Sequence, residues 1–381
     1  MIKLVHIVAN PITLKFLDGQ ITYMQKRDIN ISLISSPVNI DTISYPQKTV
    51  HHFPVLIKET ISPVADLIAC YNIYRILIKV KPTIVHAHTP KASLLGLIAA
   101  IIARIPIKIF HVHGLISYSK KGLTRSLYIF IEKITCKLAT KVFCVSHGLR
   151  NYIIDNNICP PNKIVVFGNG SINGIDTRSF NPNKYTSIMK INIKQKLHIP
   201  SKAFVIGFVG RMVRDKGIET LLSAWQTIKA RFPHTYLLFV GDFEQSDRLP
   251  NAIRSQILSD THIIITHWVK DVRSLYAIMD VLVLPSLREG MPYSLLEAQA
   301  MEIPVIASDI SGCNEIIKNG INGYVVPIHT PRLLYSAITK YISSRMLHNK
   351  HGDAGRLGVK KLFAQDVIWS ETYKEYLFLT K

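Results

Sequence analysis

Short apolar runs alternate with longer segments of helical composition along most of this chain, and this alternation restricts the folds open to it. The first set of runs covers residues 2–8, 31–35, 83–87, 107–112 and 141–145. The second set covers residues 204–209, 236–240, 262–265, 281–284 and 304–307. Strands that are buried on both faces and separated by helices form parallel sheets. The sequence therefore predicts an α/β protein with two doubly wound, Rossmann-like domains.

The boundary between these domains is expected where the periodicity is interrupted. The chain has 381 residues, enough for about two or three ordinary domains. Two proline-containing segments, at residues 181–183 and 199–201, interrupt the pattern around residues 180–200. We predict a first domain of residues 1–185 and a second of residues 186–365. Because open α/β sheets bind ligands beyond the carboxyl ends of their strands, we expect the domains to face each other across a catalytic cleft.

Cysteine usage and hydropathy indicate where the protein works. The five cysteines are scattered without a CxxC pair, which favours neither a zinc ribbon nor a disulfide framework. The first eight residues read as a strand, without the apolar core of a signal peptide. Residues 92–103 are apolar, but Lys91 and Arg104 bracket a run shorter than the roughly 20 residues that span a bilayer. We expect a buried helix there, and a cytoplasmic protein that binds the inner face of the membrane peripherally.

The positive charge is concentrated in the first half of the chain. The net charge is +21, and residues 1–190 carry 23 Lys and Arg against 8 Asp and Glu. Within residues 75–150, Glu132 is the one acidic side chain among 13 basic ones. Nucleic acid and anionic lipid both fit such a field. Leu127, Ile131, Ile134 and Leu138 have helical spacing beside a stripe of Lys133, Lys137 and Lys141. This pattern indicates a basic amphipathic helix or an ordinary surface helix with a solvated lysine face.

Two carboxylates flank a loop near residue 290. Glu289 and Glu297 have seven residues between them, after the apolar run 281–284 and around the start of a helix-forming segment. The segment is therefore a strand–loop–helix unit. Unpaired N–H groups and the helix dipole favour an anion at such a junction. The spacing is typical of a sugar-nucleotide site.

A second strand-to-helix loop carries two cations. Arg211 and Lys216 lie between the run 204–209 and a helical segment that starts at Ile218. Arg211 offers a bidentate fork for phosphate oxygens, and Lys216 a compact charge. Two solvated loop cations are the alternative interpretation. The chain contains neither a GxxxxGK[ST] loop nor the GxGxxG spacing of dinucleotide-binding proteins.

With these motifs in place, the chain resembles the retaining GT-B glycosyltransferases, the large family typified by sucrose synthase and bacterial mannosyltransferases. The resemblance rests on Gly210–Arg211 with Lys216–Gly217, on Glu289 with Glu297, and on segments 85–92, 169–176, 304–312 and 320–324. It covers nearly the whole chain and points to the capsule and O-antigen branch. It implies a GT-B fold, with residues 366–381 forming a final helix that crosses back to the first domain.

The resemblance also implies roles for site residues. Arg211 and Lys216 would hold the donor diphosphate, Glu297 the ribose hydroxyls, and Glu289 the donor sugar near its reacting carbon. The loop between the two glutamates would complete the phosphate cradle with backbone N–H groups; its residues are Gly290, Met291, Pro292, Tyr293 and Ser294. The cations would replace a metal ion, and no DxD motif occurs in the chain.

Four further positions of the first domain bear on the predicted site. His113, after the run 107–112, matches the family histidine that approaches the transferred sugar. Gly19 occupies the first strand-to-helix loop, where family members use glycine to admit the diphosphate. His86 and His88 share a strand face and could hold a metal, but no third ligand is indicated nearby, so no metal site or cofactor is predicted.

These observations together predict a reaction. We expect a retaining, metal-independent enzyme that moves a hexose or N-acetylhexosamine from a UDP donor to a polyprenyl-diphosphate-linked sugar in surface polysaccharide synthesis. No carboxylate stands out as a double-displacement nucleophile, so a front-face route is favoured. A sugar-nucleotide epimerase of similar architecture and a basic nucleic-acid-binding protein are the alternatives, although the latter leaves Glu289 and Glu297 unexplained.

Overall fold

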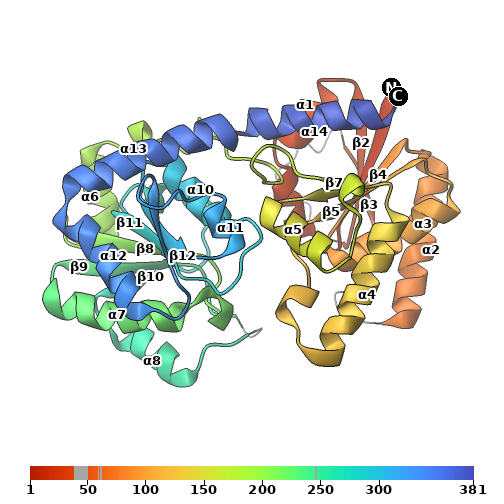
Figure 1. Ribbon diagram of the computed structural model, residues 1–381. Coiled ribbons are helices and arrows are strands. Elements are labelled where there is room, and N and C mark those ends of the chain that lie inside the picture. The colour runs from red at the N-terminus through yellow and green to blue at the C-terminus, as the bar shows by residue number, and fades with distance from the viewer. Residues whose placement is uncertain (38–49, 59, 61, 245–246) are drawn as a thin grey trace. The chain divides into compact units, whose positions relative to one another are not determined.

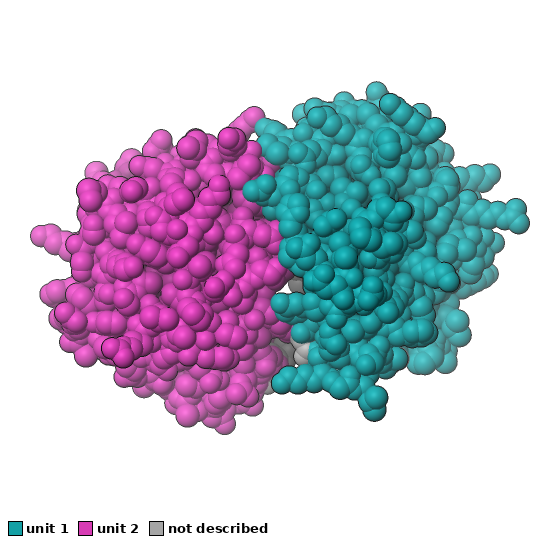
Figure 2. Space-filling view, viewed as in Figure 1, with its two compact units in different colours: residues 1–174, 365–381 teal, residues 175–364 magenta. Residues whose placement is uncertain are grey.

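The computed structural model describes residues 1–37, 50–58, 60, 62–244 and 247–381. The chain forms two compact units, which Figure 2 shows in different colours. Unit 1 comprises residues 1–174 and 365–381, and unit 2 comprises residues 175–364. Each unit is built around one parallel sheet (Figure 1), so the predicted α/β fold with two Rossmann-like domains is confirmed.

Unit 1 contains a sheet of seven strands in the order β3-β2-β1-β4-β5-β6-β7. The strands are β1 (Ile2–Ile7), β2 (Ile29–Ser35), β3 (His51–Pro54), β4 (Ile84–His88), β5 (Ile107–Val112), β6 (Lys141–Cys144) and β7 (Ile164–Val165). The α-helices are α1 (Gln20–Gln25), α2 (Pro63–Val80), α3 (Pro90–Ile102), α4 (Gly122–Leu138), α5 (His147–Asp155) and α14 (Gln365–Leu379). Short 3-10 turns are η1 (Pro11–Leu17), η3 (Ser117–Ser119) and η4 (Pro161–Lys163).

Unit 2 contains a sheet of six strands in the order β10-β9-β8-β11-β12-β13. The strands are β8 (Phe204–Val209), β9 (Thr235–Val240), β10 (Ile263–Ile265), β11 (Val281–Leu284), β12 (Val305–Ser308) and β13 (Gly323–Val326). The α-helices are α6 (Ser187–Lys196), α7 (Ile218–Arg231), α8 (Asn251–Ser259), α9 (Arg273–Tyr276), α10 (Tyr293–Ala300), α11 (Ser311–Asn314), α12 (Pro331–Ser343) and α13 (Arg345–Leu362). The 3-10 turns are η5 (Pro182–Lys184) and η6 (Arg214–Lys216).

The division between the units falls after Gly174 rather than after residue 185. Residues 175–185 belong to unit 2 because hydrogen bonds tie them to α13 and the residue after it. The N–H of Ile175 donates to the carbonyl of Phe363 over 2.7 Å, and the Arg356 guanidinium donates to the carbonyl of Phe180 over 2.9 Å. The segment expected to be a linker, residues 180–200, forms η5 and α6 of unit 2.

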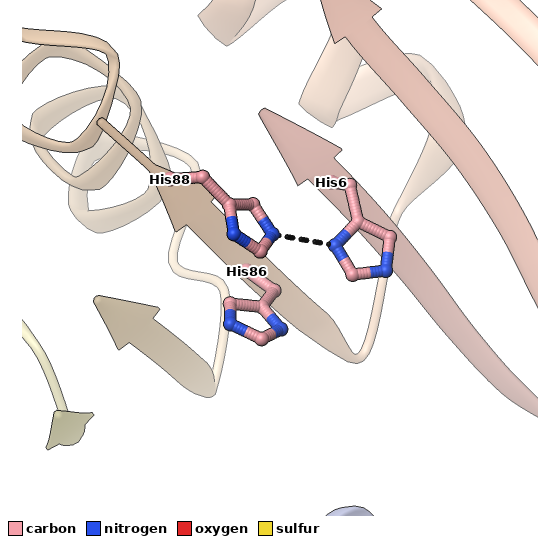
Figure 3. Close-up of side chains that lie close together, drawn as sticks. All are labelled: His6, His86 and His88. Carbon is pink, nitrogen blue, oxygen red and sulfur yellow. Dashed lines mark hydrogen bonds between the residues drawn. The ribbon is translucent and has the colours of Figure 1, made fainter. Parts of the chain in front are cut away.

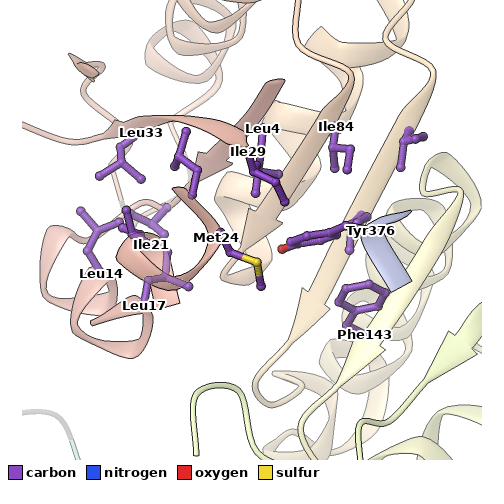
Figure 4. Packing of buried hydrophobic residues seen from close by; sticks show 14 of the residues in the cluster. Leu4, Leu14, Leu17, Ile21, Met24, Ile29, Leu33, Ile84, Phe143 and Tyr376 are labelled. Atoms are coloured by element: carbon purple, nitrogen blue, oxygen red, sulfur yellow. The ribbon is translucent and has the colours of Figure 1, made fainter. Parts of the chain in front are cut away.

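The core of unit 1 lies between its sheet and the elements that follow β1. Strand residues such as Leu4 and Ile84 pack with Leu14, Ile21 and Met24 of η1 and α1. Tyr376 of α14 is buried in the same cluster, as Figure 4 shows. The C-terminal helix is therefore an integral part of unit 1.

The apolar run at residues 92–103 belongs to α3, which is largely buried, as expected. It packs against α2 and α4, in the same part of Figure 1. No described helix combines the length and the apolar character needed to cross a membrane.

Each sheet has one place where the connections change direction. In unit 1, β1 continues outward to β2, whereas its other neighbour, β4, continues the opposite way to β5. In unit 2, β8 and β11 have the same relation. The carboxyl ends of such strand pairs form the usual ligand site of doubly wound sheets. Most of the predicted site residues follow these strands, whereas His113 follows β5.

Candidate active site

The loop from β8 to α7 is packed tightly against the end of β11. Gly217 has φ of +69° and directly precedes α7. A Cβ atom at this position would lie 1.9 Å from the carbonyl oxygen of Pro285, so only glycine fits. This contact fixes the first turn of α7, whose N–H groups lack partners within the helix.

Lys216 and Glu289 meet at this junction. The Lys216 ammonium donates to Oε1 of Glu289 over 2.6 Å, and the Ser286 hydroxyl donates to the same oxygen over 2.7 Å. The side chains of Lys216 and Glu289 are only 17% and 10% exposed. Residues 73 positions apart in sequence are brought together because β8 and β11 are neighbours in the sheet. A positive and a negative group are thus held in place with little solvent around them.

Glu297 is held by a tyrosine that the sequence did not single out. The hydroxyl of Tyr276, at the end of α9, donates to Oε2 of Glu297 over 2.8 Å. Burial of the carboxyl group raises the pKa of Glu297 to about 7, against the opposite effect of the tyrosine bond. Burial also raises the pKa of Tyr276 well above its usual range, so it remains a hydrogen-bond donor. Tyr276 was missed because it lies in an apolar segment without motif character.

Arg211 lies on the same loop but has a different partner. Its guanidinium donates to Oε2 of Glu244 over 3.0 Å, and its side chain is 55% exposed. An ion pair this exposed contributes little stability, so Arg211 is free to exchange Glu244 for another anion. Nearby, Arg288 donates two hydrogen bonds to Asp215, an ion pair between the same two loops that the sequence did not predict.

The loop between Glu289 and Glu297 runs into α10 through Pro292, which caps the helix. Met291 is buried, and Tyr293 and Ser294, the first residues of α10, are half-buried. The start of α11 packs against this loop: a Cβ atom on Gly312 would lie 2.7 Å from the carbonyl oxygen of Gly290. This close backbone contact with α11 limits how far the loop of the predicted phosphate cradle can move.

Gly19 in unit 1 makes a close contact with the C-terminal helix. It has φ of +76°, and a Cβ atom would lie 2.6 Å from the ring of Trp369. The Trp369 indole N–H donates to Oδ1 of Asn173 over 2.6 Å, and the Asn173 amide donates to the carbonyl of Asp18 over 2.9 Å. The glycine thus lets α14 and the loop that contains Asn173 pack around the turn before α1.

His113 is the residue directly after β5. It is half-buried beside Phe16, and the centroids of the two rings lie 5.7 Å apart. Burial lowers the pKa of His113 to about 4. The imidazole is therefore neutral at pH 7. It offers one hydrogen-bond donor and one acceptor, but no charge.

The expectation that His86 and His88 have no third ligand nearby is wrong. His6 of β1 lies beside them, and the ring nitrogens of the three histidines lie within 4.8 Å of one another (Figure 3). His88, His111 and His113 form a second such group. The sequence did not show this because the grouping depends on strand order: His6 pairs with His86, and His88 with His111. Either group has the donor atoms of a metal site, although several of these nitrogens already bond to one another.

One cavity among the described residues lies elsewhere in unit 2. It has a volume of about 570 Å³ and is lined by residues before β11 and β12 and by α6 and α13, including Asp280, Ile303, Lys190 and Arg345. This is the amino end of the strands, away from the Lys216–Glu289 pair. The candidate site therefore rests on the chemistry of the loops rather than on this cavity.

Two protein families match successive parts of the chain. Residues 19–171 match Glycosyltransferase Family 4, and residues 189–357 match Glycosyl transferases group 1. The capsular polysaccharide biosynthesis glycosyltransferase CapM of Staphylococcus aureus is 31% identical over 98% of this chain and 96% of CapM. The chain belongs to the group 1 glycosyltransferase family. The predicted resemblance is thus confirmed, and the chain is a glycosyltransferase.

Two further relatives extend the comparison. The UDP-Gal:alpha-D-GlcNAc-diphosphoundecaprenol alpha-1,3-galactosyltransferase of Escherichia coli is 30% identical over 76% of this chain and 73% of that enzyme. The crystal structure of Anabaena Alr3699/HepE in complex with UDP-glucose covers 99% of both chains with a TM-score of 0.82, at 18% sequence identity. The latter likeness is one of fold, and the two units of this group 1 glycosyltransferase are the two domains of the GT-B fold.

Proposed function

We propose that this chain is a retaining glycosyltransferase that transfers a hexose or N-acetylhexosamine from a UDP donor to a polyprenyl-diphosphate-linked saccharide in surface polysaccharide synthesis. The observation that carries the proposal is the Lys216–Glu289 pair, held beside the first turn of α7 where β8 and β11 end. The UDP-Gal donor and the diphosphoundecaprenol-linked acceptor of the E. coli relative, together with the capsular role of CapM, support the donor, the acceptor and the pathway. The UDP-glucose complex of the structural relative supports a uridine nucleotide.

The donor diphosphate would bind between the two cationic residues and the loop before α10. Lys216 is paired with Glu289, and Arg211 with Glu244. The diphosphate oxygens would replace these carboxylates as the partners of the two cations. Backbone N–H groups of residues 290–294 would complete the cradle. Glu297, with Tyr276 on one carboxyl oxygen, would accept from the ribose hydroxyls on the other.

Transfer would proceed on one face of the donor sugar. As the bond to the sugar breaks, negative charge grows on the diphosphate, and Arg211 and Lys216 stabilise it without a metal ion. The departing phosphate oxygen takes the proton of the acceptor hydroxyl that attacks. Glu289 would orient the donor sugar, while His113 would approach it as a neutral hydrogen-bonding group and Gly19 would admit the diphosphate to the turn before α1.

The acceptor would be reached at the inner face of the cytoplasmic membrane through α4. This helix buries Glu132, which accepts from the Ser117 hydroxyl, and leaves Leu123 90% exposed, with Leu127 and Phe130 also exposed. Lys120 and Lys121 precede it, and Lys133 and Lys137 lie along it, whereas Lys141 begins β6 instead. Apolar side chains that face outward among lysines fit an anionic bilayer surface. The chain would work there as a peripheral membrane protein.

A transfer assay tests the proposal. The wild-type protein is offered a panel of UDP- and GDP-sugars, with and without a polyprenyl-diphosphate-linked saccharide, in the presence and absence of EDTA. We expect UDP release that requires the acceptor and survives EDTA, and NMR of the product should show the anomeric configuration of the donor. Conversion of the nucleotide sugar without acceptor would instead identify an epimerase. An inverted product would contradict the retaining mechanism.

A further inference from the structure

We propose that His88, His111 and His113 form a binding site in unit 1 for a transition-metal ion such as Zn²⁺, and that an ion held there inhibits sugar transfer. The inhibition rests on the proposed function, which gives His113 a part in transfer. The metal site itself is a property of unit 1 and can be measured without any substrate.

The three histidines come together at the carboxyl ends of two neighbouring strands. His88 ends β4, His111 lies opposite it in β5, and His113 directly follows β5. Each of them offers one ring nitrogen, and these three nitrogens lie within 4.8 Å of one another. Three imidazoles with one open coordination position are an established donor set for zinc. The register of two adjacent strands thus supplies a full set of protein ligands.

Two of the ring nitrogens already have the spacing of ligands on one ion. Nδ1 of His88 lies 3.2 Å from Nε2 of His113. Zinc binds imidazole nitrogens at about 2.0–2.1 Å, so two such ligands of a tetrahedral ion lie about 3.3 Å apart. An ion can therefore replace the hydrogen bond between these nitrogens with little movement of either ring.

The third residue has a nitrogen that the fold leaves unused. Among the described residues, Nε2 of His111 is buried and has no hydrogen-bond partner. Buried polar atoms are normally paired, so an unpaired one requires an explanation. A neutral imidazole has one bare acceptor nitrogen, which is the atom that binds a metal ion. A metal ion on Nε2 of His111 would give this atom the partner that it lacks.

Hydrogen bonds at the other ring nitrogens orient two of the ligands. Nδ1 of His111 lies 3.1 Å from Nε2 of His86, whose own Nδ1 lies 2.6 Å from the Tyr376 hydroxyl. Nε2 of His88 lies 2.9 Å from Nδ1 of His6, as Figure 3 shows. With an ion on the remaining nitrogens, His111 would donate to His86, and His88 to His6. Metal-binding histidines are usually oriented by such a bond from the second ring nitrogen.

The neighbouring group of His6, His86 and His88 is less suited to an ion. Both ring nitrogens of His86 have partners, so metal binding would break one of these hydrogen bonds. All three of its residues are buried, whereas the proposed site includes the half-buried His113. A metal site requires an entry path as well as ligands. These differences favour the group that contains His113.

An ion at this site would affect transfer through His113. The proposed function requires His113 to approach the donor sugar as a neutral hydrogen-bonding ring. With Nε2 bound to an ion, the ring would be fixed beside His88 and would carry a positive charge next to it. Because the proposed chemistry uses no metal, such an ion acts as an inhibitor, and its removal by EDTA should restore transfer.

The test is titration of Co²⁺, a spectroscopic substitute for Zn²⁺, into the full-length protein, stripped with EDTA and free of any histidine tag. Cobalt in a four-coordinate site gives visible absorption bands much stronger than those of the hydrated ion. We expect stoichiometric binding that Zn²⁺ displaces. Binding should weaken about tenfold or more in His113→Asn and in His111→Phe. It should be unchanged in His51→Asn, which alters an exposed histidine of the same unit.

The variant His6→Asn distinguishes the two histidine groups. Its amide oxygen can still accept from Nε2 of His88, so the proposed site should keep its affinity, whereas the other group loses a ligand. Loss of cobalt binding in His6→Asn, with retention in His113→Asn, would assign the ion to the other group and overturn the proposal. Absence of the absorption bands in the wild-type protein would overturn it without any variant.

Transfer activity gives a second readout. We expect saturating Zn²⁺ to lower acceptor-dependent UDP release about tenfold or more in the wild type, and EDTA to reverse this loss. The same Zn²⁺ should slow His111→Phe much less, relative to the rate of that variant without zinc. Zinc that binds at this site without slowing transfer would overturn the proposed inhibition. A protein that binds cobalt there but transfers no sugar would contradict the proposed function alone.

Discussion

The two units place opposite kinds of side chain at the same point of the same architecture. Where β8 and β11 end in unit 2, a lysine and a glutamate form an ion pair, and an exposed arginine lies on the same loop. Where β1 and β4 end in unit 1, histidines are packed against one another, and burial keeps them neutral. The fold supplies the position, and the residues at the strand ends decide whether an anion or a neutral group is held there.

The largest expected effect comes from removing the negative charge of Glu289 in unit 2. Glu289→Gln keeps the shape of the side chain but weakens its hold on Lys216 and on the donor sugar. We expect turnover to fall by a factor of about a hundred or more, as measured by acceptor-dependent UDP release. The control is Asp353→Asn, an exposed acid of α13 that lines the other cavity, which should leave turnover unchanged. Equal activity of the two variants would remove the basis for placing the donor at this junction.

A pair of glycines with positive φ, Gly217 and Gly122, distinguishes crowding from backbone strain. Gly217→Ala places a Cβ atom against the Pro285 carbonyl, so we expect it to lower the free energy of unfolding by about 2 kcal/mol or more. Gly122 has φ of +58° but nothing within 4 Å of its Cβ position, so Gly122→Ala should cost only about 1 kcal/mol. Denaturant unfolding measures both. A smaller loss in Gly217→Ala would mean that the loop from β8 can move away from β11.

The units should also respond to acid in opposite directions. A buried histidine with a lowered pKa binds fewer protons when folded, so its stabilising effect is present above about pH 6.5 and is lost as the pH falls toward the folded pKa. At pH 5 the loss of folding stability amounts to about 2 kcal/mol for one histidine with a folded pKa of about 3. Glu297, with a raised pKa of about 7, stabilises the folded state most below about pH 4.5, and this effect is lost as the pH rises through 7.

Hydrogen exchange, corrected for intrinsic rates, measures this contrast in separate peptides. Between pH 7.5 and 5.5 we expect protection to fall in β1, β4 and β5, but not in β11 and α10. In Glu297→Gln, protection of α10 should no longer increase on acidification. Protection of β1, β4 and β5 should fall as it does in the wild type. A uniform loss of protection in both units would show that the histidines are not the groups that titrate.

The smallest effect concerns the surface of unit 1. Leu123→Asp on α4 should weaken binding to vesicles that contain anionic lipid by about tenfold or more, because an exposed apolar contact with the bilayer is lost. Leu357→Asp on α13 of unit 2 is the matched control, since Leu357 is 68% exposed and lies outside the basic half of the chain. Soluble substrates should be turned over normally by both variants. Equal vesicle binding would show that α4 does not dock on the membrane.

Much of the fold could be predicted because it depends on local patterns. Buried parallel strands read as apolar runs, so ten of the strands could be located from the sequence. β3, β7 and β13 were missed because they lie at the edges of their sheets and are short or partly polar. The boundary at Gly174 was missed because it depends on bonds from Ile175 and Phe180 to residues far along the chain.

The candidate site divides in the same way. Glu289, Lys216 and Arg211 stand in loops between clear strands and helices, where a charged residue has few structural reasons to occur. The partners that hold the site, Tyr276 and the buried histidines, look like core residues in the sequence. The grouping of the histidines follows only from the register of β1, β4 and β5, which places His6 beside His86, 80 positions away in the sequence.

Titration of UDP into the wild-type protein by calorimetry, beside Lys216→Met and Lys202→Met, tests most directly whether the charged junction of unit 2 holds the donor. Lys202 is an exposed lysine in the loop before β8, so both variants remove the same charge from the same unit. We expect Lys216→Met to weaken UDP binding about tenfold or more, and Lys202→Met to bind as the wild type does. Equal weakening in both variants, or none in Lys216→Met, would contradict the assignment of the donor site.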